Sequence, residues 1–199
     1  MTGPRDDAPL ILGLGGTSRP GATSERSVRR ALEHCEQRGA RTMLLGGPFI
    51  AGLPLFNPGS PERTDSEREL VDAVRRCDGI IVSTPGYHGS LSGPIKNALD
   101  LIEDTARDER PYLTDRGFGC IVNANGWQAV GTTLVALRSI AHALRAWPTP
   151  FGAALNASLP LFDQEGGCID SATDTQLERV AAQVCDFARF RRLLATDRS

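Results

Sequence analysis

The sequence contains no run of about 18 apolar residues, the length that a membrane-spanning helix needs. Its first residues, Met1 to Asp7, also lack the apolar core of a secretory signal peptide. We therefore expect a cytoplasmic protein without a membrane partner. The length of 199 residues suits one well-cored domain. We place that domain at residues 9–195, after a loose tail over residues 1–8.

Neither an excess of basic charge nor a paired set of cysteines is present. The chain has 22 basic and 24 acidic residues and a formal net charge of −2, which disfavours nucleic acid as a partner. Its five cysteines are scattered, odd in number and without a Cys-x-x-Cys spacing (Cys35, Cys77, Cys120, Cys168 and Cys185). We therefore expect reduced thiols without a redox role, and no metal site.

Short apolar runs alternate with longer segments of helical periodicity, which predicts a parallel sheet between layers of helices. The expected strands are Pro9–Gly13, Arg41–Leu45, Gly79–Ser83, Gly117–Asn123 and Phe151–Leu155. The expected helices are Ser24–Arg38, Asp65–Arg76, Ser92–Thr105, Thr132–Arg145 and Asp174–Leu194. This order predicts an α/β fold with a doubly wound, five-stranded parallel sheet and helices on both faces.

The segment Gly46–Arg63 fits neither the strand nor the helix pattern. It contains Pro48, Pro54, Pro58 and Pro61, so we expect a long loop rather than a regular element. Its apolar residues Leu53, Leu55 and Phe56 are too numerous for a simply solvated loop. We expect them to pack on the domain, on a second subunit or on a cofactor.

The stretch after the first expected strand is rich in glycine, hydroxyl and cationic groups. It runs Gly15-Gly16-Thr17-Ser18-Arg19-Pro20-Gly21-Ala22-Thr23-Ser24 and leads into the first expected helix. A helix N-terminus offers free N–H groups and a partial positive charge, and either Thr23 or Ser24 is expected to cap it. We predict a phosphate site here, with Glu25 pointing away from the anion. Its candidate residues are Thr17, Ser18, Arg19, Thr23 and Ser24.

Three other sites for phosphate groups do not fit these residues. A Walker loop ends in Gly-Lys-Ser or Gly-Lys-Thr, and the chain has neither here. A dinucleotide fingerprint requires a third glycine where this chain has Ser18, and an acidic residue after the second strand, where it has Gly46. A phosphoacceptor receiver domain ends its third strand in aspartate, where this chain has Ser83.

A second loop follows the third expected strand and suits a flat ring. It runs Thr84-Pro85-Gly86-Tyr87-His88-Gly89-Ser90-Leu91-Ser92-Gly93-Pro94. The proline fixes the backbone direction, the glycines let a planar ligand approach the main chain, and Tyr87 and His88 add an aromatic face and a polar edge. Ligands of open α/β sheets bind at the carboxyl ends of parallel strands, where both loops lie. A phosphate loop and a ring loop together predict a flavin nucleotide.

Three segments carry a resemblance to a known family. They are Gly16-Thr17-Ser18-Arg19, then Leu53-Pro54-Leu55-Phe56-Asn57, and finally Pro85-Gly86-Tyr87-His88-Gly89-Ser90 leading into Gly93-Pro94-Ile95-Lys96-Asn97-Ala98-Leu99-Asp100. With them, residues 9 to 145 of the chain resemble the NAD(P)H-dependent FMN reductases. The resemblance implies a flavodoxin-like fold, FMN as the cofactor, and NADPH or NADH as the hydride donor.

The resemblance also implies roles for particular residues. The FMN phosphate is held by Thr17, Arg19, Thr23 and Ser24, and the isoalloxazine ring is lined, mainly by backbone amides, by Pro85, Gly86, Tyr87, His88, Gly89 and Ser90. A third wall follows the fourth strand and consists of Asn123, Asn125, Gly126 and Trp127. Family members usually have Gly and Ser in that wall and an acidic residue at the position of Gly86. They typically form dimers or tetramers, so we expect a homodimer or homotetramer whose subunits cover the apolar 53–56 loop.

The expected function is hydride transfer from NADPH or NADH to FMN and on to an acceptor. That acceptor is free flavin, released for a partner monooxygenase, or another small molecule such as a quinone, azo dye, nitroaromatic or metal ion. Flavin carries the difficult chemistry, so no catalytic residue is assigned, although His88 is suited to proton transfer. The alternatives are a flavodoxin-type electron carrier, which nicotinamide oxidation would exclude, and a flavin-free binding module, which FMN binding would exclude.

Overall fold

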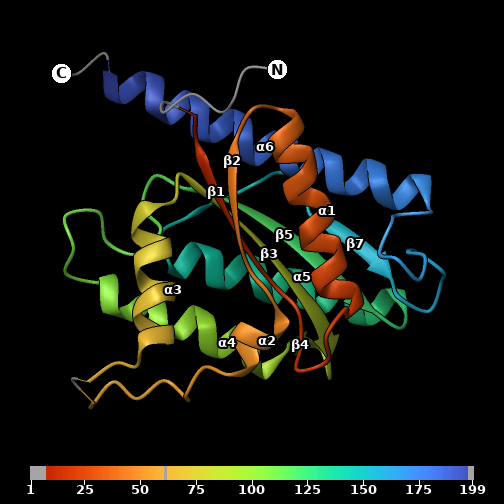
Figure 1. Ribbon diagram of the computed structural model, residues 1–199, viewed down its shortest axis with the longest axis horizontal. Coiled ribbons are helices and arrows are strands. Elements are labelled where there is room, and N and C mark those ends of the chain that lie inside the picture. The colour runs from red at the N-terminus through yellow and green to blue at the C-terminus, as the bar shows by residue number, and fades with distance from the viewer. Residues whose placement is uncertain (1–7, 61, 197–199) are drawn as a thin grey trace.

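The computed structural model describes residues 8–60 and 62–196, and a twisted parallel sheet runs through its centre (Figure 1). The sheet order is β2 (Arg41–Leu45), β1 (Leu10–Gly15), β3 (Gly79–Tyr87) and β5 (Gly117–Ala124). The next position is shared by two short strands, β6 (Trp147–Pro148) and β7 (Ala153–Asn156), which pair with successive parts of β5. This order is that of a flavodoxin-like, doubly wound sheet, as predicted.

Helices cover both faces of the sheet because each strand presents apolar side chains on both sides. The helices are α1 (Thr23–Gln37), α2 (Gly47–Ala51), α3 (Asp65–Arg76), α4 (Gly93–Asp100), α5 (Trp127–Ala143) and α6 (Ser171–Thr196), with a 3-10 helix at Leu101–Thr105. Ile11, Ile81 and Ile121 form one core with α1 and α6, which lie side by side in Figure 1. The opposite side chains, such as Leu12, form the other core with α3, α4 and α5.

All five expected strands are present, but several boundaries differ from those predicted. The third strand continues to Tyr87 instead of ending at Ser83, because its parallel pairing with β5 extends to Pro85 and a short strand, β4 (Ser90–Leu91), then pairs with its end. The fourth helix begins at Trp127, not Thr132, since Gly126 (φ 123°) turns the chain directly into it. As a result, the carboxyl end of β3 and the amino end of α5 extend further towards the predicted site than expected.

The segment Gly46–Arg63 was wrongly expected to contain no helix. Residues Gly47–Ala51 form α2, where Pro48 occupies a first-turn position and its missing N–H needs no partner. Leu53 is buried and Phe56 packs on the core, whereas Leu55 remains 86% exposed. The apolar residues therefore divide between the core of this chain and its surface.

At the amino end, the expected loose tail lies outside the described residues except for Ala8. Ala8 is buried, and its carbonyl accepts a hydrogen bond from Arg192 Nη1 of α6 at 3.2 Å. Within residues 8–60 and 62–196, no helix has both the length and the apolar character to cross a membrane.

Candidate functional site

A cavity of about 800 Å³ opens at the carboxyl ends of β1, β3 and β5. Its walls come from the loop after β1 (residues 17–19 and 22–24), the end of β3 (85–88), the segment into α4 (92 and 94), the end of β5 with α5 (123–125 and 129), and Ala157 after β7. Both loops that the sequence predicted as ligand sites therefore border one cavity. Its size is that of a cofactor-binding pocket.

The loop after β1 is shaped by glycines that no other residue could replace without strain. Gly16 has a φ of 124°, and a Cβ built on it would lie 2.4 Å from the Cα of Gly47. Gly21 has a φ of 66°. Between them, the backbone N–H of Arg19 donates to Thr17 Oγ1 at 3.1 Å, which closes a local turn. The loop thus holds its hydroxyl and guanidinium groups at the cavity without help from a ligand.

The N-cap of α1 is Ala22, so the expectation that Thr23 or Ser24 caps this helix was wrong. No side chain caps the helix, and Thr23 and Ser24 lie within its first turn. Because the first N–H groups of a helix have no intrahelical partner, this terminus presents donors to the cavity. The two hydroxyls, which a capping role would have occupied, line the same wall.

Two serines that line the cavity have buried hydroxyls without a hydrogen-bond partner among the described residues. They are Ser24 Oγ on α1 and Ser92 Oγ at the N-cap of α4. Leaving a buried hydroxyl unpaired costs about 1–3 kcal/mol, so such groups in a binding cavity indicate a polar ligand. One hydroxyl belongs to the phosphate loop and the other to the ring loop. The residues present therefore fit a ligand that is polar at both ends.

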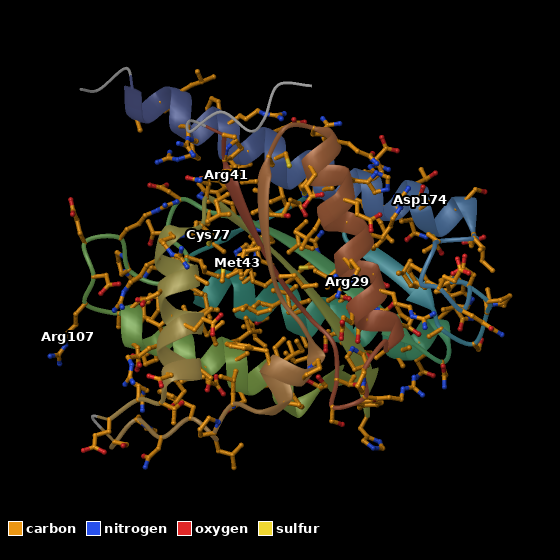
Figure 2. The ribbon with its side chains drawn as sticks, in the orientation of Figure 1. Arg29, Arg41, Met43, Cys77, Arg107 and Asp174 are labelled. Carbon is orange, nitrogen blue, oxygen red and sulfur yellow. The ribbon has the colours of Figure 1, made fainter. Side chains whose placement is uncertain are left out.

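Glu25 does not oppose an anion in this cavity. Its carboxylate accepts a hydrogen bond from the backbone N–H of Gly47 at 3.2 Å and forms an ion pair with Arg29 at 3.1 Å. Arg29 lies on the outer side of α1 (Figure 2). The carboxylate thus links α1 to α2 beside Gly16, and Glu25 is not among the residues that line the cavity.

The ring side of the cavity is a two-residue hairpin between β3 and β4. Tyr87 pairs with Ser90, and the turn residues His88 and Gly89 have φ values of 50° and 84°. Positive φ at both positions is the geometry of a type I′ turn, which suits the twist of the flanking strands. Behind the hairpin, Thr84 Oγ1 accepts the backbone N–H of Ser92 at 3.1 Å. The hairpin that carries Tyr87 and His88 is therefore positioned both by the pairing of β3 with β4 and by the hydrogen bond between Thr84 and Ser92.

Gly86, where family members commonly have an acidic residue, leaves no space for a side chain. A Cβ at this position would lie 2.8 Å from Thr133 Oγ1 and 3.2 Å from the Cβ of Ala124. Thr133 Oγ1 in turn donates to the carbonyl of Ser90 at 3.3 Å. The glycine therefore allows α5 to pack directly against the hairpin.

Asn123 lines the cavity, but its side chain belongs to a buried network. Ser27 Oγ donates to Asn123 Oδ1 at 2.9 Å, and Asn123 Nδ2 donates to Ser83 Oγ at 3.1 Å. These three side chains link α1, β3 and β5 directly beneath the cavity floor. Asn123 therefore fixes the relative positions of the two loops.

The predicted site residues do not all border the same space. The main cavity is lined by Thr17, Ser18, Arg19, Thr23, Ser24, Pro85, Gly86, Tyr87, His88, Asn123 and Asn125. A neighbouring hollow of about 420 Å³ is lined by Gly89, Asn125, Gly126 and Trp127 among others. Ser90 lies in β4 and lines neither space.

Six further lining residues were not named as individual candidates: Ala22, Ser92, Pro94, Ala124, Ala129 and Ala157. Ala157 follows the carboxyl end of the last strand, so the rule that placed the other loops also applied to it. Ser92 carried a usable signal, since it lies in the ring loop directly before a Gly-Pro helix start. The alanines contribute only apolar surface to the cavity, and alanine as a residue type does not indicate a cavity-lining position.

The thiols contribute no reactive group to the cavity. All five cysteines are free, and burial raises the pKa of Cys77 to about 11 and that of Cys120 to about 12. None of them lines the cavity. Within the described part of the chain, no cluster of histidine, cysteine or acidic residues is arranged to hold a metal ion. The cavity therefore has the character of a cofactor site rather than a nucleophilic centre.

Comparisons with known proteins agree with this geometry. A probable NADPH:quinone oxidoreductase 2 of Oryza sativa subsp. japonica is 28% identical over 193 residues, covering 89% of this chain and 88% of that protein. An NADH-dependent FMN reductase of Pseudomonas putida is 32% identical over 102 residues, covering 50% of this chain and 53% of that one. Among solved structures, the NAD(P)H:acceptor oxidoreductase FerB of Paracoccus denitrificans has the same fold, with a TM-score of 0.71 at 19% identity over 92% of this chain and 99% of that chain.

A family model also matches most of the chain. Residues 9–158 match the NADPH-dependent FMN reductases, and this range contains both loops and the end of β5 that form the cavity. FMN and NAD(P)H are accordingly the cofactor and the hydride donor to be expected at this site. The chain belongs to the NADPH-dependent FMN reductase family and is an NAD(P)H-dependent flavin oxidoreductase.

Proposed function

We propose that the cavity binds FMN in one orientation, with the phosphate at the loop after β1 and the ring at the β3–β4 hairpin. The observation that carries this proposal is the pair of unpartnered buried hydroxyls, Ser24 Oγ and Ser92 Oγ, on the walls of one cavity. The phosphate is held by Thr17, Ser18, Arg19, Thr23, Ser24 and the N-terminus of α1. The ring is bordered by Pro85, Gly86, Tyr87 and His88 on one side and by Asn123 and Asn125 on the other.

The chain's own contribution to the reaction is binding, orientation and exclusion of water. FMN held here would supply the redox chemistry, accepting hydride from NADPH or NADH and donating electrons to an acceptor. The buried Ser27–Asn123–Ser83 network keeps the two loops at a fixed separation. The imidazole of His88, on the cavity rim, is placed to hand a proton to an acceptor.

We propose that the final acceptor is a small molecule. The rice relative's name assigns it a quinone, and that of the Pseudomonas putida relative assigns it FMN. Release of reduced FMN to a partner monooxygenase is one form of this function, and reduction of a quinone, azo or nitro compound is the other. The protein acts in the cytoplasm, which accords with its five free thiols.

We also propose that residues 9–195 form a single domain that assembles as a homodimer or homotetramer. Leu55 is 86% exposed in the loop after α2, and Val135 is exposed on α5. A second subunit would cover these side chains. Sedimentation equilibrium tests the assembly directly, since a monomeric mass at micromolar concentration contradicts it.

The proposed FMN orientation is tested by comparing FMN with riboflavin, which lacks the phosphate. We expect Arg19→Ala to weaken FMN binding by roughly 10- to 100-fold, because a hydrogen bond to a charged group is worth about 1.5–3 kcal/mol. Riboflavin affinity should stay unchanged. Calorimetric titration of the apoprotein with both flavins gives the two constants.

The matched control is Arg107→Ala. Arg107 is exposed and projects from the loop after the 3-10 helix, away from α1 (Figure 2). Its removal should change neither affinity. Equal losses for FMN and riboflavin in Arg19→Ala would contradict the phosphate assignment.

A further inference from the structure

A second concave surface adjoins the FMN cavity and is not used by the proposed FMN contacts. This distal hollow, of about 420 Å³, is lined by Gly89, residues 125–129 and Thr132. It shares the lining residues Asn125 and Ala129 with the main cavity, so the two spaces are adjacent. The hairpin contributes to both, with Tyr87 and His88 on the main cavity and Gly89 on the hollow.

Trp127 gives the distal hollow a large aromatic surface. It is the first residue of α5, and its side chain is 63% exposed. The other tryptophan of the chain, Trp147, packs against the ring of Phe187 with centroids 5.6 Å apart. An indole placed on the wall of a hollow beside a cofactor cavity offers a face on which a planar ring can stack.

The turn glycine keeps this hollow open. Gly89 has a φ of 84°, and a Cβ built on it would come within 3.9 Å of Thr132 Oγ1 across the hollow. Thr132 Oγ1 is itself turned back onto its helix, where it lies 3.2 Å from the carbonyl of Gln128. Gly89 and Thr132 therefore extend no polar side-chain group across the space.

The lining of the distal hollow carries no ionisable side chain. Its residues are glycine, asparagine, tryptophan, glutamine, alanine and threonine. The N-terminus of α5 borders the hollow without a cationic side chain beside it, whereas the phosphate end of the main cavity has both Arg19 and the N-terminus of α1. A phosphate or carboxylate would find no oppositely charged side chain in the hollow, whereas a neutral ring would exchange water for contact with Trp127.

We propose that the distal hollow is an acceptor subsite for the outer ring of a neutral acceptor with two linked rings, and that Trp127 determines this specificity. The reducible ring of such an acceptor lies in the main cavity. For a quinone, the balanced reaction is quinone plus NADPH plus H⁺ giving hydroquinone plus NADP⁺. The inference rests on the proposed function, since only an acceptor reduced by this enzyme needs the subsite.

A kinetic experiment compares two acceptors that share one reducible ring. They are 1,4-benzoquinone and 2-phenyl-1,4-benzoquinone, which differ by the neutral outer ring. In Trp127→Ala we expect KM for the phenyl compound to rise about tenfold, as loss of an aromatic stack and its buried area allows, and KM for benzoquinone to stay within about twofold. Equal changes for both quinones, or no change for either, would overturn the proposal.

The control variant is Trp147→Ala. Trp147 is 59% exposed, similar to Trp127, but it pairs with Gly117 at the amino end of β5, the end opposite the cavity. We expect its loss to leave the preference for the phenyl compound intact. A drop in the sedimentation mass of Trp127→Ala, together with equal losses for both quinones, would assign Trp127 to a subunit contact instead.

A binding measurement without turnover completes the test. Trp147→Phe leaves Trp127 as the one tryptophan and keeps a ring against Phe187. Adding 4-phenylphenol, a neutral two-ring compound that the enzyme cannot reduce, should quench Trp127 emission saturably, and phenol should not. Absence of saturable quenching would overturn the subsite. Bleaching of bound FMN by NADPH should remain normal in each variant, so failure of the subsite is distinguishable from failure of the proposed function.

Discussion

At the scale of single residues, serine hydroxyls of nearly equal burial have opposite environments. Ser27 Oγ lies 2.8 Å from the carbonyl of Thr23 and 2.9 Å from Asn123 Oδ1, so its proton always has an acceptor. Ser24 Oγ, three residues earlier on the same helix, is buried without a partner. The first hydroxyl stabilises the fold, whereas the second destabilises the apoprotein and gains a partner if a ligand binds beside it.

This contrast predicts opposite behaviour for two alanine variants. Ser24→Ala should leave the apoprotein as stable as the parent or up to about 1 kcal/mol more stable, and should weaken FMN binding about tenfold. Ser27→Ala should destabilise the apoprotein by about 1–3 kcal/mol because Asn123 Oδ1 loses its donor. Urea unfolding of both apoproteins and FMN titration give the four values. A Ser24→Ala apoprotein that is clearly less stable than the parent would show that this hydroxyl has a structural role.

At the scale of elements, the contact between the β3–β4 hairpin and α5 determines the shape of the cavity at the end where the flavin ring is proposed to bind. Gly86 on β3 and Thr133 on α5 are complementary, since the absent Cβ of one leaves room for the hydroxyl of the other. The hydroxyl then reaches the carbonyl of Ser90 at 3.3 Å. Together they bring α5 and Trp127 alongside the hairpin tip.

Gly86→Ala should therefore lower the free energy of unfolding by about 1–3 kcal/mol, the usual cost of overpacking a tight contact. Part of this loss should be recovered in Gly86→Ala combined with Thr133→Ala, because the closest atom, Thr133 Oγ1, is removed. Urea unfolding of the two single variants and the double variant forms a cycle. Purely additive losses would contradict direct contact between the two positions.

The attachment of α6 to α1 predicts a dependence of stability on pH. Asp174 of α6 forms an ion pair with Arg30 at 2.7 Å and a hydrogen bond with His34 Nε2 at 2.8 Å, and these partners, Arg30 first, lower the pKa of the carboxyl from 3.8 to about 2. Figure 2 shows Asp174 near the start of α6. Because the pKa is lower in the folded state, the carboxylate stabilises the fold above about pH 4, and this contribution is lost as the pH falls towards 2.

The check compares Asp174→Asn with the parent in urea at several pH values. We expect the variant to be less stable at pH 7 and the difference to shrink between pH 4 and pH 2. Asp186→Asn, which removes a more exposed carboxylate of the same helix, should show a smaller difference throughout. A stability difference for Asp174→Asn that persists unchanged at pH 2 would mean that the carboxylate charge is not its source.

At the scale of the whole molecule, the sequence predicted the sheet and the location of the cavity because both depend on strong patterns. Apolar runs such as Ile80-Ile81-Val82 can be accommodated only in a strand buried on both faces, and loops at the carboxyl ends of such strands meet. The comparisons confirm the family that the Gly16–Arg19 and Pro85–Ser90 segments indicated.

The rest depended on tertiary contacts that no local pattern encodes. The start of α5 at Trp127 follows from the backbone turn at Gly126, and the extension of β3 follows from its pairing with β5 and β4. Likewise, Asn123 was predicted from the sequence to contact the cofactor, yet its side-chain amide is hydrogen-bonded to Ser27 and Ser83. Partners that are distant in the sequence decide these points.

The central claim is that this chain binds FMN and reduces it with a nicotinamide. The most direct test is an anaerobic titration of the FMN-loaded protein with NADPH or NADH, followed by the absorbance of the flavin. The account predicts that one equivalent of nicotinamide bleaches one equivalent of bound flavin. A protein that binds no FMN, or whose bound FMN stays oxidised with both NADPH and NADH, would contradict it.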